Sequence, residues 1–340
     1  MPTSTIQILV QVAVDEPALA KVRQMRGIHV QIVSPEAGDR HLPAELLRDT
    51  QILFCLQPPE DFGQMVNVKW IQLWSVGYNQ LFSLPLVERG IRATNARGCS
   101  DVPIAEWTVA MMINPARNLR QMIRNQEAAI WDVRAEYQQE VRGMTVGIWG
   151  YGGIGRETAR LARQLGMRVH VLSRGGVKPI GAVYCLPGTG DPQGVLPNKV
   201  YLAGHEEAFL SELDFLILAV PLTRRTEGMI GECQLRWMRR SAFVLNPARG
   251  PLIQEQALLR ALSEGWIAGV ALDTHYKYPL PPEHSLWCFQ KAILTPHISG
   301  SALNPHFCER TWDIFTQNIA RLISGQPLLN ELSAEQLRGE

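Results

Sequence analysis

Residues 145–155 read T-V-G-I-W-G-Y-G-G-I-G, and this stretch decides the fold of the chain. An apolar run leads into Gly150, Gly152 and Gly155 in G-x-G-x-x-G spacing, and a helical stretch follows. A strand, a tight glycine turn and a helix in this order suit a dinucleotide. The first glycine makes the turn, the second admits the pyrophosphate, and the third lets the helix pack on the strand. The helix N-terminus then faces the negative charge. The residues predicted to bind the cofactor here are Gly150, Gly152, Gly153, Ile154 and Gly155.

The composition limits the class of protein. A chain of 340 residues with 46% hydrophobic content is long enough for about two domains with full cores. Lys and Arg number 33 against 32 Asp and Glu, so no basic surplus points to nucleic acid as a partner. The longest apolar runs, such as 215–220, are far shorter than a membrane span. We therefore expect a protein that binds neither nucleic acid nor a membrane.

The cysteines and the first residues indicate the compartment. Six cysteines are scattered without a C-x-x-C pair or a zinc-site spacing, which is typical of reduced thiols. Residues 1–12 lack the basic flank and cleavage pattern of a signal peptide and are expected to contain a first strand. The sequence therefore predicts a cytoplasmic protein without a bound metal.

Short apolar segments alternate with helical ones along most of the chain. The strand-like segments before residue 100 are 6–12, 28–33, 51–56 and 70–75. Those after the glycine fingerprint are 168–172, 214–220, 241–246, 268–273 and 292–297. Between 175 and 204 the chain is rich in Gly and Pro. Strands that alternate with helices predict an α/β fold with parallel sheets covered by helices.

The fingerprint begins in the middle of the chain, so a domain-sized segment precedes it. Residues 104–131 have a helical pattern, with a kink or break expected at Asn114–Pro115, and 306–325 form another amphipathic helix. The simplest arrangement inserts a nucleotide domain, 105–297, into a first domain made of 1–104 and 298–340. Ligands are then expected in the cleft between the two domains.

Five segments together resemble the D-isomer-specific 2-hydroxyacid dehydrogenases, which include glyoxylate/hydroxypyruvate reductases. The segments are 150–155, P-L-T-R-R-T at 221–226, N-P-A-R-G at 246–250, G-V-A-L-D at 269–273 and T-P-H-I-S-G at 295–300. The resemblance covers most of the chain and is strongest over about 143–325. It implies two doubly wound, Rossmann-like domains, one flavodoxin-like and one NAD(P)-binding. It also implies a homodimer formed through about 104–131.

The same resemblance assigns further ligand contacts. S-V-G-Y-N at 75–79 resembles the loop of the family that binds the substrate carboxylate, so Ser75, Val76 and Gly77 are expected to offer backbone N–H groups. Asp273 matches an aspartate near the nicotinamide carboxamide. The other residues that the matching motifs assign to the cofactor are Pro221, Thr226, Pro247 and Ala248.

Arg249 follows one predicted strand-like segment and His297 ends another, both at the carboxyl end of the sheet. A guanidinium there can hold a 2-keto acid through two oxygens and stabilise the alkoxide-like charge that develops as hydride arrives. Imidazole can deliver the proton that carbonyl reduction requires, a contribution of typically about 10²–10⁴-fold. We therefore expect Arg249 and His297 to bind the substrate and to act in catalysis.

Tyr278 departs from the family pattern. The family carries a glutamate before the proline, and this glutamate stabilises the protonated histidine; here the segment reads D-T-H-Y-K-Y-P-L-P and places Tyr278 before Pro279. A phenol can hydrogen-bond an imidazole, but it is neutral near pH 7 and cannot stabilise imidazolium as a carboxylate does. Three interpretations stay open. Tyr278 orients a working His297, or the reaction is a hydride abstraction from a formate- or phosphite-like oxyanion, or the protein binds nucleotide without turnover, like the corepressors of the family.

The cofactor preference follows from the end of the strand after the fingerprint. An NAD site usually places an acid about 20 residues beyond the glycines, to bind the ribose 2′-hydroxyl. Here Ser173 and Arg174 occupy that place, and a hydroxyl with a guanidinium suits a 2′-phosphate. The sequence thus predicts a reductase that converts a small 2-keto acid to the D-2-hydroxy acid, with NADP preferred and NAD as the alternative.

Overall fold

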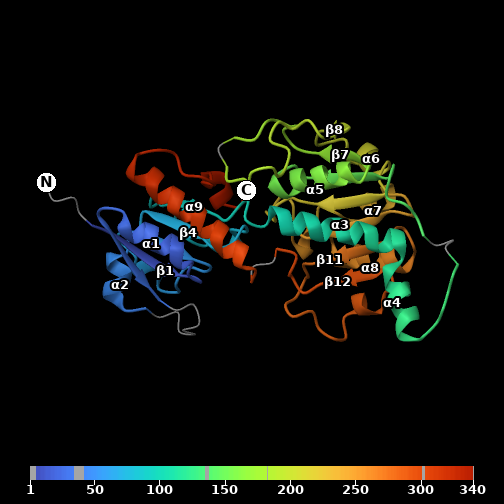
Figure 1. Ribbon diagram of the computed structural model, residues 1–340, viewed down its shortest axis with the longest axis horizontal. Coiled ribbons are helices and arrows are strands. Elements are labelled where there is room, and N and C mark those ends of the chain that lie inside the picture. Colours follow the sequence, from blue (N-terminus) through green and yellow to red (C-terminus); the bar gives the residue numbers. More distant parts are fainter. Residues whose placement is uncertain (1–4, 34–41, 135–137, 182, 301–302, 340) are drawn as a thin grey trace. The chain divides into compact units, whose positions relative to one another are not determined.

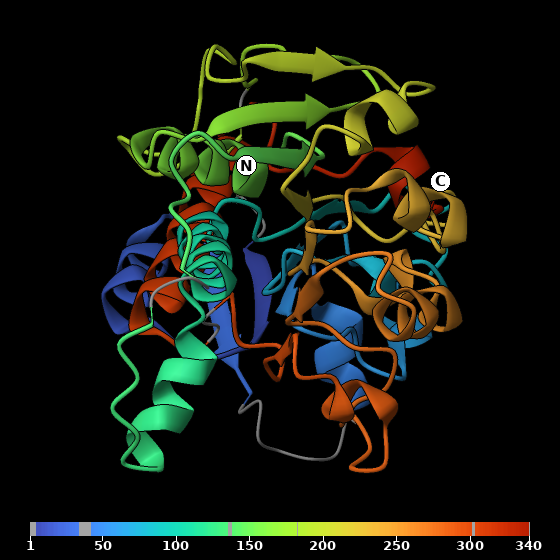
Figure 2. The same cartoon turned by 90° about the vertical axis from the view of Figure 1, so that its right-hand side faces the viewer.

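Two parallel β-sheets, each covered by helices on both faces, make up the chain (Figure 1, Figure 2). The computed structural model describes residues 5–33, 42–134, 138–181, 183–300 and 303–339. It divides into two compact units, 1–100 with 181–185 and 302–340, and 101–180 with 186–301. The sequence-based limits differ from these by a few residues, and the short segment 181–185 was not foreseen in the first unit. The domain boundaries 1–104 with 298–340 and 105–297 therefore stay a prediction.

The first unit has the strand order β2-β1-β3-β4-β5, which is that of flavodoxin-like folds. Its strands are β1 (Ile6–Gln11), β2 (Ile28–Ile32), β3 (Ile52–Cys55), β4 (Trp70–Leu73) and β5 (Arg92–Thr94). Its α-helices are α1 (Glu16–Gln24), α2 (Ala44–Asp49), α9 (Pro305–Ile323) and α10 (Ala334–Leu337). Asp15 caps α1 by accepting the N–H of Ala18, and Asn304 caps α9 by accepting the N–H of His306.

The core of the first unit shows why the chain returns to it at its C-terminal end. Phe54 of β3 and Trp70 of β4 are fully buried against Phe315 of α9, with ring centroids 4.4 and 5.5 Å away. Leu53 alternates with Phe54 along β3 and packs on the opposite face with Leu47 of α2. One face of the sheet therefore depends on a helix that lies about 250 residues later in the sequence.

The second unit has the strand order β12-β11-β10-β9-β6-β7-β8. Its strands are β6 (Thr145–Trp149), β7 (Arg168–Leu172), β8 (Lys199–Tyr201), β9 (Phe215–Leu218), β10 (Phe243–Asn246), β11 (Gly269–Leu272) and β12 (Ala292–Leu294). Counted from β6, this is the dinucleotide-binding order 3-2-1-4-5-6 with one further strand. The order reverses between β6 and β9, where ligands bind in folds of this type.

Helices cover both faces of the second sheet. Along β9, Phe215 and Ile217 pack with α3 (Asp101–Arg117) and α5 (Gly153–Gln164), which lie side by side. Leu216 and Leu218 point to the opposite face of the sheet, where they pack with a second layer of helices. Those helices are α6 (Glu206–Leu210), α7 (Glu232–Trp237) and α8 (Glu255–Ser263).

Two local predictions differ from the structure. Helix α3 continues through Pro115 to Arg117, and the break falls at Asn118, a left-handed residue with φ 48° that precedes α4 (Leu119–Glu127). The short strand β8 lies inside the Gly/Pro-rich stretch, where no strand was predicted. Within the described ranges, no helix combines the length and the apolar character needed to cross a bilayer.

Candidate active site

The glycine fingerprint forms the turn between β6 and α5, and each glycine has its own physical reason. Gly150 has φ +101°, a conformation that side chains rarely adopt. A Cβ on Gly155 would lie 2.4 Å from the carbonyl oxygen of Gly150, so only glycine lets the helix approach the strand. A Cβ on Gly153 would lie 1.8 Å from a carboxylate oxygen of Asp101. A Cβ on Gly152 would meet no atom within 4 Å, so open space lies before the start of α5.

Two neighbouring strand ends flank this turn. After β7, Ser173 donates its hydroxyl to the carbonyl oxygen of Gly176 at 3.0 Å, and Arg174 is exposed. After β9, the hydroxyl of Thr226 donates to the carbonyl oxygen of Pro221 at 2.7 Å and closes that loop. Because β7, β6 and β9 are adjacent and parallel, these loops and the fingerprint share one edge of the sheet.

Arg249 is held by a loop that Asn246 shapes. The buried side chain of Asn246 accepts the N–H groups of Ala248 and Arg249 and donates to the carbonyl oxygen of Arg249 at 2.8 Å. The guanidinium of Arg249 donates one bond, from Nη1 to the carbonyl oxygen of Ala248 at 2.7 Å. Burial lowers the pKa of Arg249 from its usual value, but arginine stays charged throughout the accessible pH range. Among the described residues no acceptor binds its other donors, so these are available to an anion.

Asp273 anchors the segment that carries His297. Its buried carboxylate accepts the hydroxyl of Thr295 at 2.6 Å and the N–H groups of Ile298 and Ser299, each at 2.9 Å. The hydroxyl of Ser299 donates to it as well. Two carboxylate oxygens offer about four acceptor positions, and these four donors occupy them. The predicted contact of Asp273 with the nicotinamide carboxamide thus competes with bonds inside the protein.

His297 is held in a strained backbone conformation. Its φ is +59°, in the left-handed region where a residue with a side chain is uncommon. Its N–H donates to the carbonyl oxygen of Thr295 at 3.0 Å, and His275 Nε2 lies 2.8 Å from the same oxygen. Since a carbonyl only accepts, Nε2 of His275 carries the proton. His275 therefore braces the loop that carries the proposed proton donor.

Tyr278 meets His297 through its ring and not through its hydroxyl. The ring centroids of the two residues are 5.6 Å apart at an interplanar angle of 48°, and Tyr278 Oη accepts the N–H of His275 at 3.2 Å. Burial raises the pKa of Tyr278, so the phenol stays protonated near neutral pH. Burial, followed by the positive charge of Arg249, lowers the pKa of His297 from its usual value. The structure thus brings Arg249, Asp273, Tyr278 and His297 together at the carboxyl ends of β10, β11 and β12.

The first unit contains the loop after β4, which the sequence predicts to bind the substrate carboxylate. Ser75 donates its hydroxyl to the carbonyl oxygen of Gly77 at 2.7 Å, and Asn95 donates to the carbonyl oxygen of Val76 at 2.7 Å. Across the described residues, no acceptor takes up the backbone N–H groups of Ser75, Val76 and Gly77. Unsatisfied N–H groups in a tight turn suit a carboxylate.

Sequence reasoning missed residues that act through others. Asn246 and His275 carried weak signals, as the first residue of N-P-A-R-G and as a histidine two positions after Asp273. Thr295 and Ser299 belong to the T-P-H-I-S-G motif, but only the fold shows that both bind Asp273. No group of three or more His, Cys, Asp or Glu residues is placed to hold a metal ion, in the part of the chain that the structure describes.

The two adjacent glycines of the fingerprint give a paired prediction. Gly152→Ala should leave the free energy of unfolding within about 1 kcal/mol of the parent value, because the new methyl group enters open space. It should weaken NADPH binding at least about tenfold by filling the space where phosphates approach. Gly153→Ala should destabilise the chain by about 1–3 kcal/mol, because its Cβ collides with Asp101.

Thermal unfolding and titration of protein fluorescence with NADPH measure the two effects. Parent-like NADPH affinity in Gly152→Ala would contradict the assigned approach of the phosphates.

Comparisons with known proteins identify the family to which the chain belongs. The family model described as D-isomer specific 2-hydroxyacid dehydrogenase, NAD binding domain, matches residues 109–299. A glyoxylate reductase of Thermococcus kodakarensis is 32% identical over 283 residues, which are 78% of this chain and 79% of the relative.

Two solved structures share the fold over nearly the whole chain. A D-isomer specific 2-hydroxyacid dehydrogenase family protein of Aeromonas salmonicida has a TM-score of 0.80 at 24% identity, over 97% of this chain and 99% of the other. An NADPH-dependent glyoxylate/hydroxypyruvate reductase of Sinorhizobium meliloti, in complex with NADP and sulfate, has a TM-score of 0.76 at 22% identity, over 99% and 100%. The chain therefore belongs to the D-isomer-specific 2-hydroxyacid dehydrogenase family.

Proposed function

We propose that the chain reduces a small 2-keto acid, such as glyoxylate or hydroxypyruvate, to the D-2-hydroxy acid with a reduced nicotinamide cofactor. One observation carries the proposal. Arg249, Tyr278 and His297 meet at the edge of the sheet on which the glycine fingerprint also lies. The glyoxylate reductase relatives support the same class of reaction.

The residues at this edge fit a nicotinamide dinucleotide. Open space before α5 admits phosphates at Gly152, and the N–H groups of the first turn face it. The residues proposed to hold the cofactor are Gly150, Gly152, Gly153, Ile154, Gly155, Ser173, Arg174, Pro221, Thr226, Pro247, Ala248 and Asp273. When bound, the reduced cofactor supplies a hydride.

The chain's own residues bind the substrate and manage its charge. Arg249 holds the carboxylate and the keto oxygen through its remaining donors, and it stabilises the negative charge that grows on that oxygen. The N–H groups of Ser75, Val76 and Gly77 bind the carboxylate. His297 donates the proton to the oxygen as imidazolium. Tyr278 orients the imidazole by ring contact, and Asp273 and His275 hold the loop that carries it.

A substrate panel tests the reaction. Glyoxylate and hydroxypyruvate should oxidise NADPH with the purified chain, and formate and phosphite should not reduce NADP. Turnover of formate or phosphite alone would replace the proposal by hydride abstraction, which needs no imidazolium. Cofactor binding without turnover of any acid would favour a nucleotide-binding protein without catalysis.

The pH profile tests the role of His297. The acid is the protonated form, and burial together with Arg249 lowers its pKa, so kcat/KM for reduction should fall as pH rises through that lowered pKa. Tyr278→Glu adds a carboxylate beside the imidazole, which stabilises imidazolium, and should move the fall to higher pH by about one unit. Tyr278→Phe is the matched control, since it keeps the ring contact and adds no charge. Identical profiles for the Glu and Phe variants would refute the acid role.

We also propose that NADP is preferred over NAD, because Arg174 stands exposed at the end of β7 where an NAD site usually has an acid. Arg174→Ala should raise KM for NADPH at least about tenfold and KM for NADH less than about threefold, since only NADPH carries the 2′-phosphate. Arg240→Ala removes the same charge at the opposite edge of the sheet and serves as the control. A strong preference of the parent chain for NADH would contradict the proposal.

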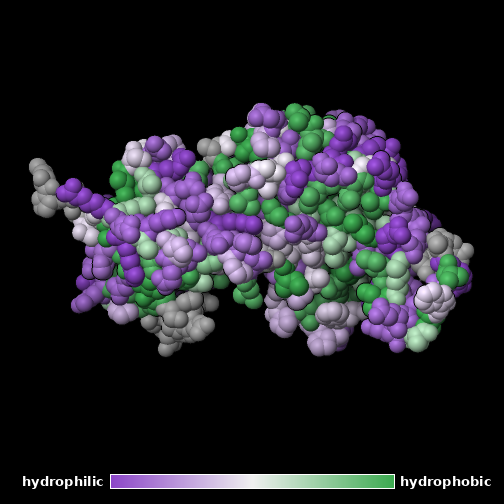
Figure 3. All heavy atoms as spheres, in the orientation of Figure 1, coloured by the Kyte–Doolittle hydropathy of each residue, from purple (hydrophilic) through white to green (hydrophobic). Residues whose placement is uncertain are grey.

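We propose further that the chain forms a homodimer through the region of α3 and α4. Helix α4 buries none of its residues, and apolar side chains on and after it reach the surface beside polar ones (Figure 3). The most exposed are Trp131 at 92%, Val133 at 78% and Ile130 at 57%, and Ile123 is 55% exposed. By analogy with the family, we propose that helix α4 of a second copy of the chain covers this apolar surface. Sedimentation at twice the 38.1 kDa mass supports this, and a monomer at micromolar concentration overturns it.

The scattered cysteines and the absence of C-x-x-C spacing support a cytoplasmic location for the protein. Cell fractionation tests this assignment, and recovery with secreted proteins would contradict it.

A further inference from the structure

A buried phenol–carboxylate pair links the glycine fingerprint to a distant segment of the chain. Tyr151, between Gly150 and Gly152, donates its hydroxyl to Asp191 Oδ2 at 2.7 Å. Both residues are buried, at 8% and 3% exposure. The Asp191 carboxylate also accepts the N–H groups of Val195 and Leu196, each at 3.0 Å, so its own loop holds it in place. Burial alone would raise the pKa of Asp191, but these three donors lower it, and the group is a carboxylate at neutral pH.

Arg156 is the third member of this cluster. It lies in the first turn of α5, is only 6% exposed, and donates from Nε to the carbonyl oxygen of Tyr151 at 3.1 Å. Its guanidinium carbon lies 4.8 Å from the centre of the Tyr151 ring. Its two terminal nitrogens donate to the carbonyl oxygens of Asp191 and Lys178. A single buried cation thus joins the fingerprint, the start of α5 and the segment after β7.

The next residue of α5 strengthens the same connection. Glu157 is 1% exposed, accepts the N–H of Gly190 and forms a two-bond ion pair with Arg160 at 2.6 and 2.8 Å. Arg156 and Glu157 therefore bind the backbone of Lys178, Gly190 and Asp191 from the start of α5. Buried polar groups that are fully bonded in this way favour a single local conformation.

The composition of the fingerprint explains why it needs such support. In the sequence Gly150-Tyr151-Gly152-Gly153, Tyr151 carries the only side chain, and glycine backbones lose the most conformational freedom on ordering. A binding loop that occupies its competent conformation only part of the time has an apparent affinity lowered by that fraction. The N–H of Gly150 donates to the carbonyl oxygen of Leu172 at 2.9 Å, and Tyr151 adds two further contacts, through its phenol and its carbonyl oxygen.

We propose that Asp191 is a positioning residue of the cofactor site. Through Tyr151 and Arg156 it fixes the backbone of Gly150–Gly153, so that the N–H groups at the start of α5 are arranged for the cofactor diphosphate before it binds. This inference rests on the proposed function, because it requires a nicotinamide dinucleotide at the fingerprint. It adds that affinity for the cofactor depends on a residue 40 positions beyond the loop it serves.

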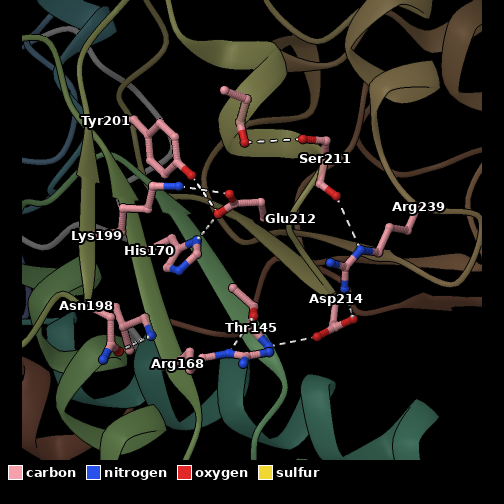
Figure 4. A network of polar contacts seen from close by, with 12 residues as sticks. Thr145, Arg168, His170, Asn198, Lys199, Tyr201, Ser211, Glu212, Asp214 and Arg239 are labelled. Carbon is pink, nitrogen blue, oxygen red and sulfur yellow. Dashed lines mark hydrogen bonds and ion pairs between the residues drawn. The ribbon is translucent and has the colours of Figure 1, made fainter.

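A similar pair in the same sheet supplies a matched control. Tyr201 of β8 donates its hydroxyl to Glu212 at 2.6 Å, and Lys199 and His170 approach the same carboxylate (Figure 4). This tyrosine is also buried, at 7% exposure, but its hydroxyl does not bind the fingerprint. Tyr201→Phe therefore removes a bond of the same chemistry and leaves Tyr151 and Asp191 in place.

The experiment compares Tyr151→Phe, Asp191→Asn, their double variant and Tyr201→Phe in the full chain. Binding of NADPH is measured by calorimetry, thermal unfolding is measured without cofactor, and kcat is measured at saturating NADPH. Tyr151→Phe and Asp191→Asn should each weaken NADPH binding about tenfold and keep kcat within about twofold of the parent value. The double variant should be no weaker than the weaker single variant, because both changes remove one interaction. Tyr201→Phe should bind NADPH within about twofold of the parent.

Three results overturn the inference. Equal NADPH affinities of Tyr151→Phe and Tyr201→Phe would assign Tyr151 to general stability. Additive losses in the double variant would show that the two residues act separately. A parent chain that binds neither NADPH nor NADH would overturn the proposed function together with this inference. Titration of the parent chain alone distinguishes this result from the other two.

Discussion

The parallel direction of the strands in the second sheet is the constraint on which the proposed chemistry depends. Parallel strands bring their carboxyl ends to one edge, and five strand ends there carry the fingerprint, the loop after β9, Arg249, Asp273 and the His297 segment. These residues are spread over about 150 positions of sequence. The alternation of buried residues along each strand, with one helix layer on each face, keeps that edge in register.

The sequence predicted the helices and strands whose positions follow from glycine backbone freedom and from the periodicity of apolar residues. The strand–glycine–helix order and the apolar runs reflect backbone freedom and periodicity, so β6, α5 and the neighbouring strands could be predicted. Strand β8 has only three residues and lies among glycines and prolines, where no periodicity develops. Pro115 removes one donor without ending α3, because the helix packs against α5.

The roles of Asn246, His275 and Asp191 could not be read from the sequence. Each acts through a contact that only the folded chain forms. His275 braces a carbonyl 20 positions away, and Asp191 braces a tyrosine 40 positions away. Tyr278 shows the converse. Its departure from the family pattern is visible in the sequence, but only the structure shows that its hydroxyl accepts the N–H of His275 while its ring contacts His297. His297, the proposed proton donor, is thus buried beside Arg249, and its pKa is lowered by burial and by that positive charge, against the opposing effect of Asp273.

Isotope transfer is the most direct measurement of the proposed chemistry. Hydroxypyruvate is the substrate of choice, because C2 of its product is a stereocentre with or without the label, and the NADPH carries deuterium at the transferring position of C4. Direct hydride transfer at this site predicts a D-2-hydroxy acid with one deuterium on C2. An L product, or a product whose C2 hydrogen comes from solvent, would contradict it.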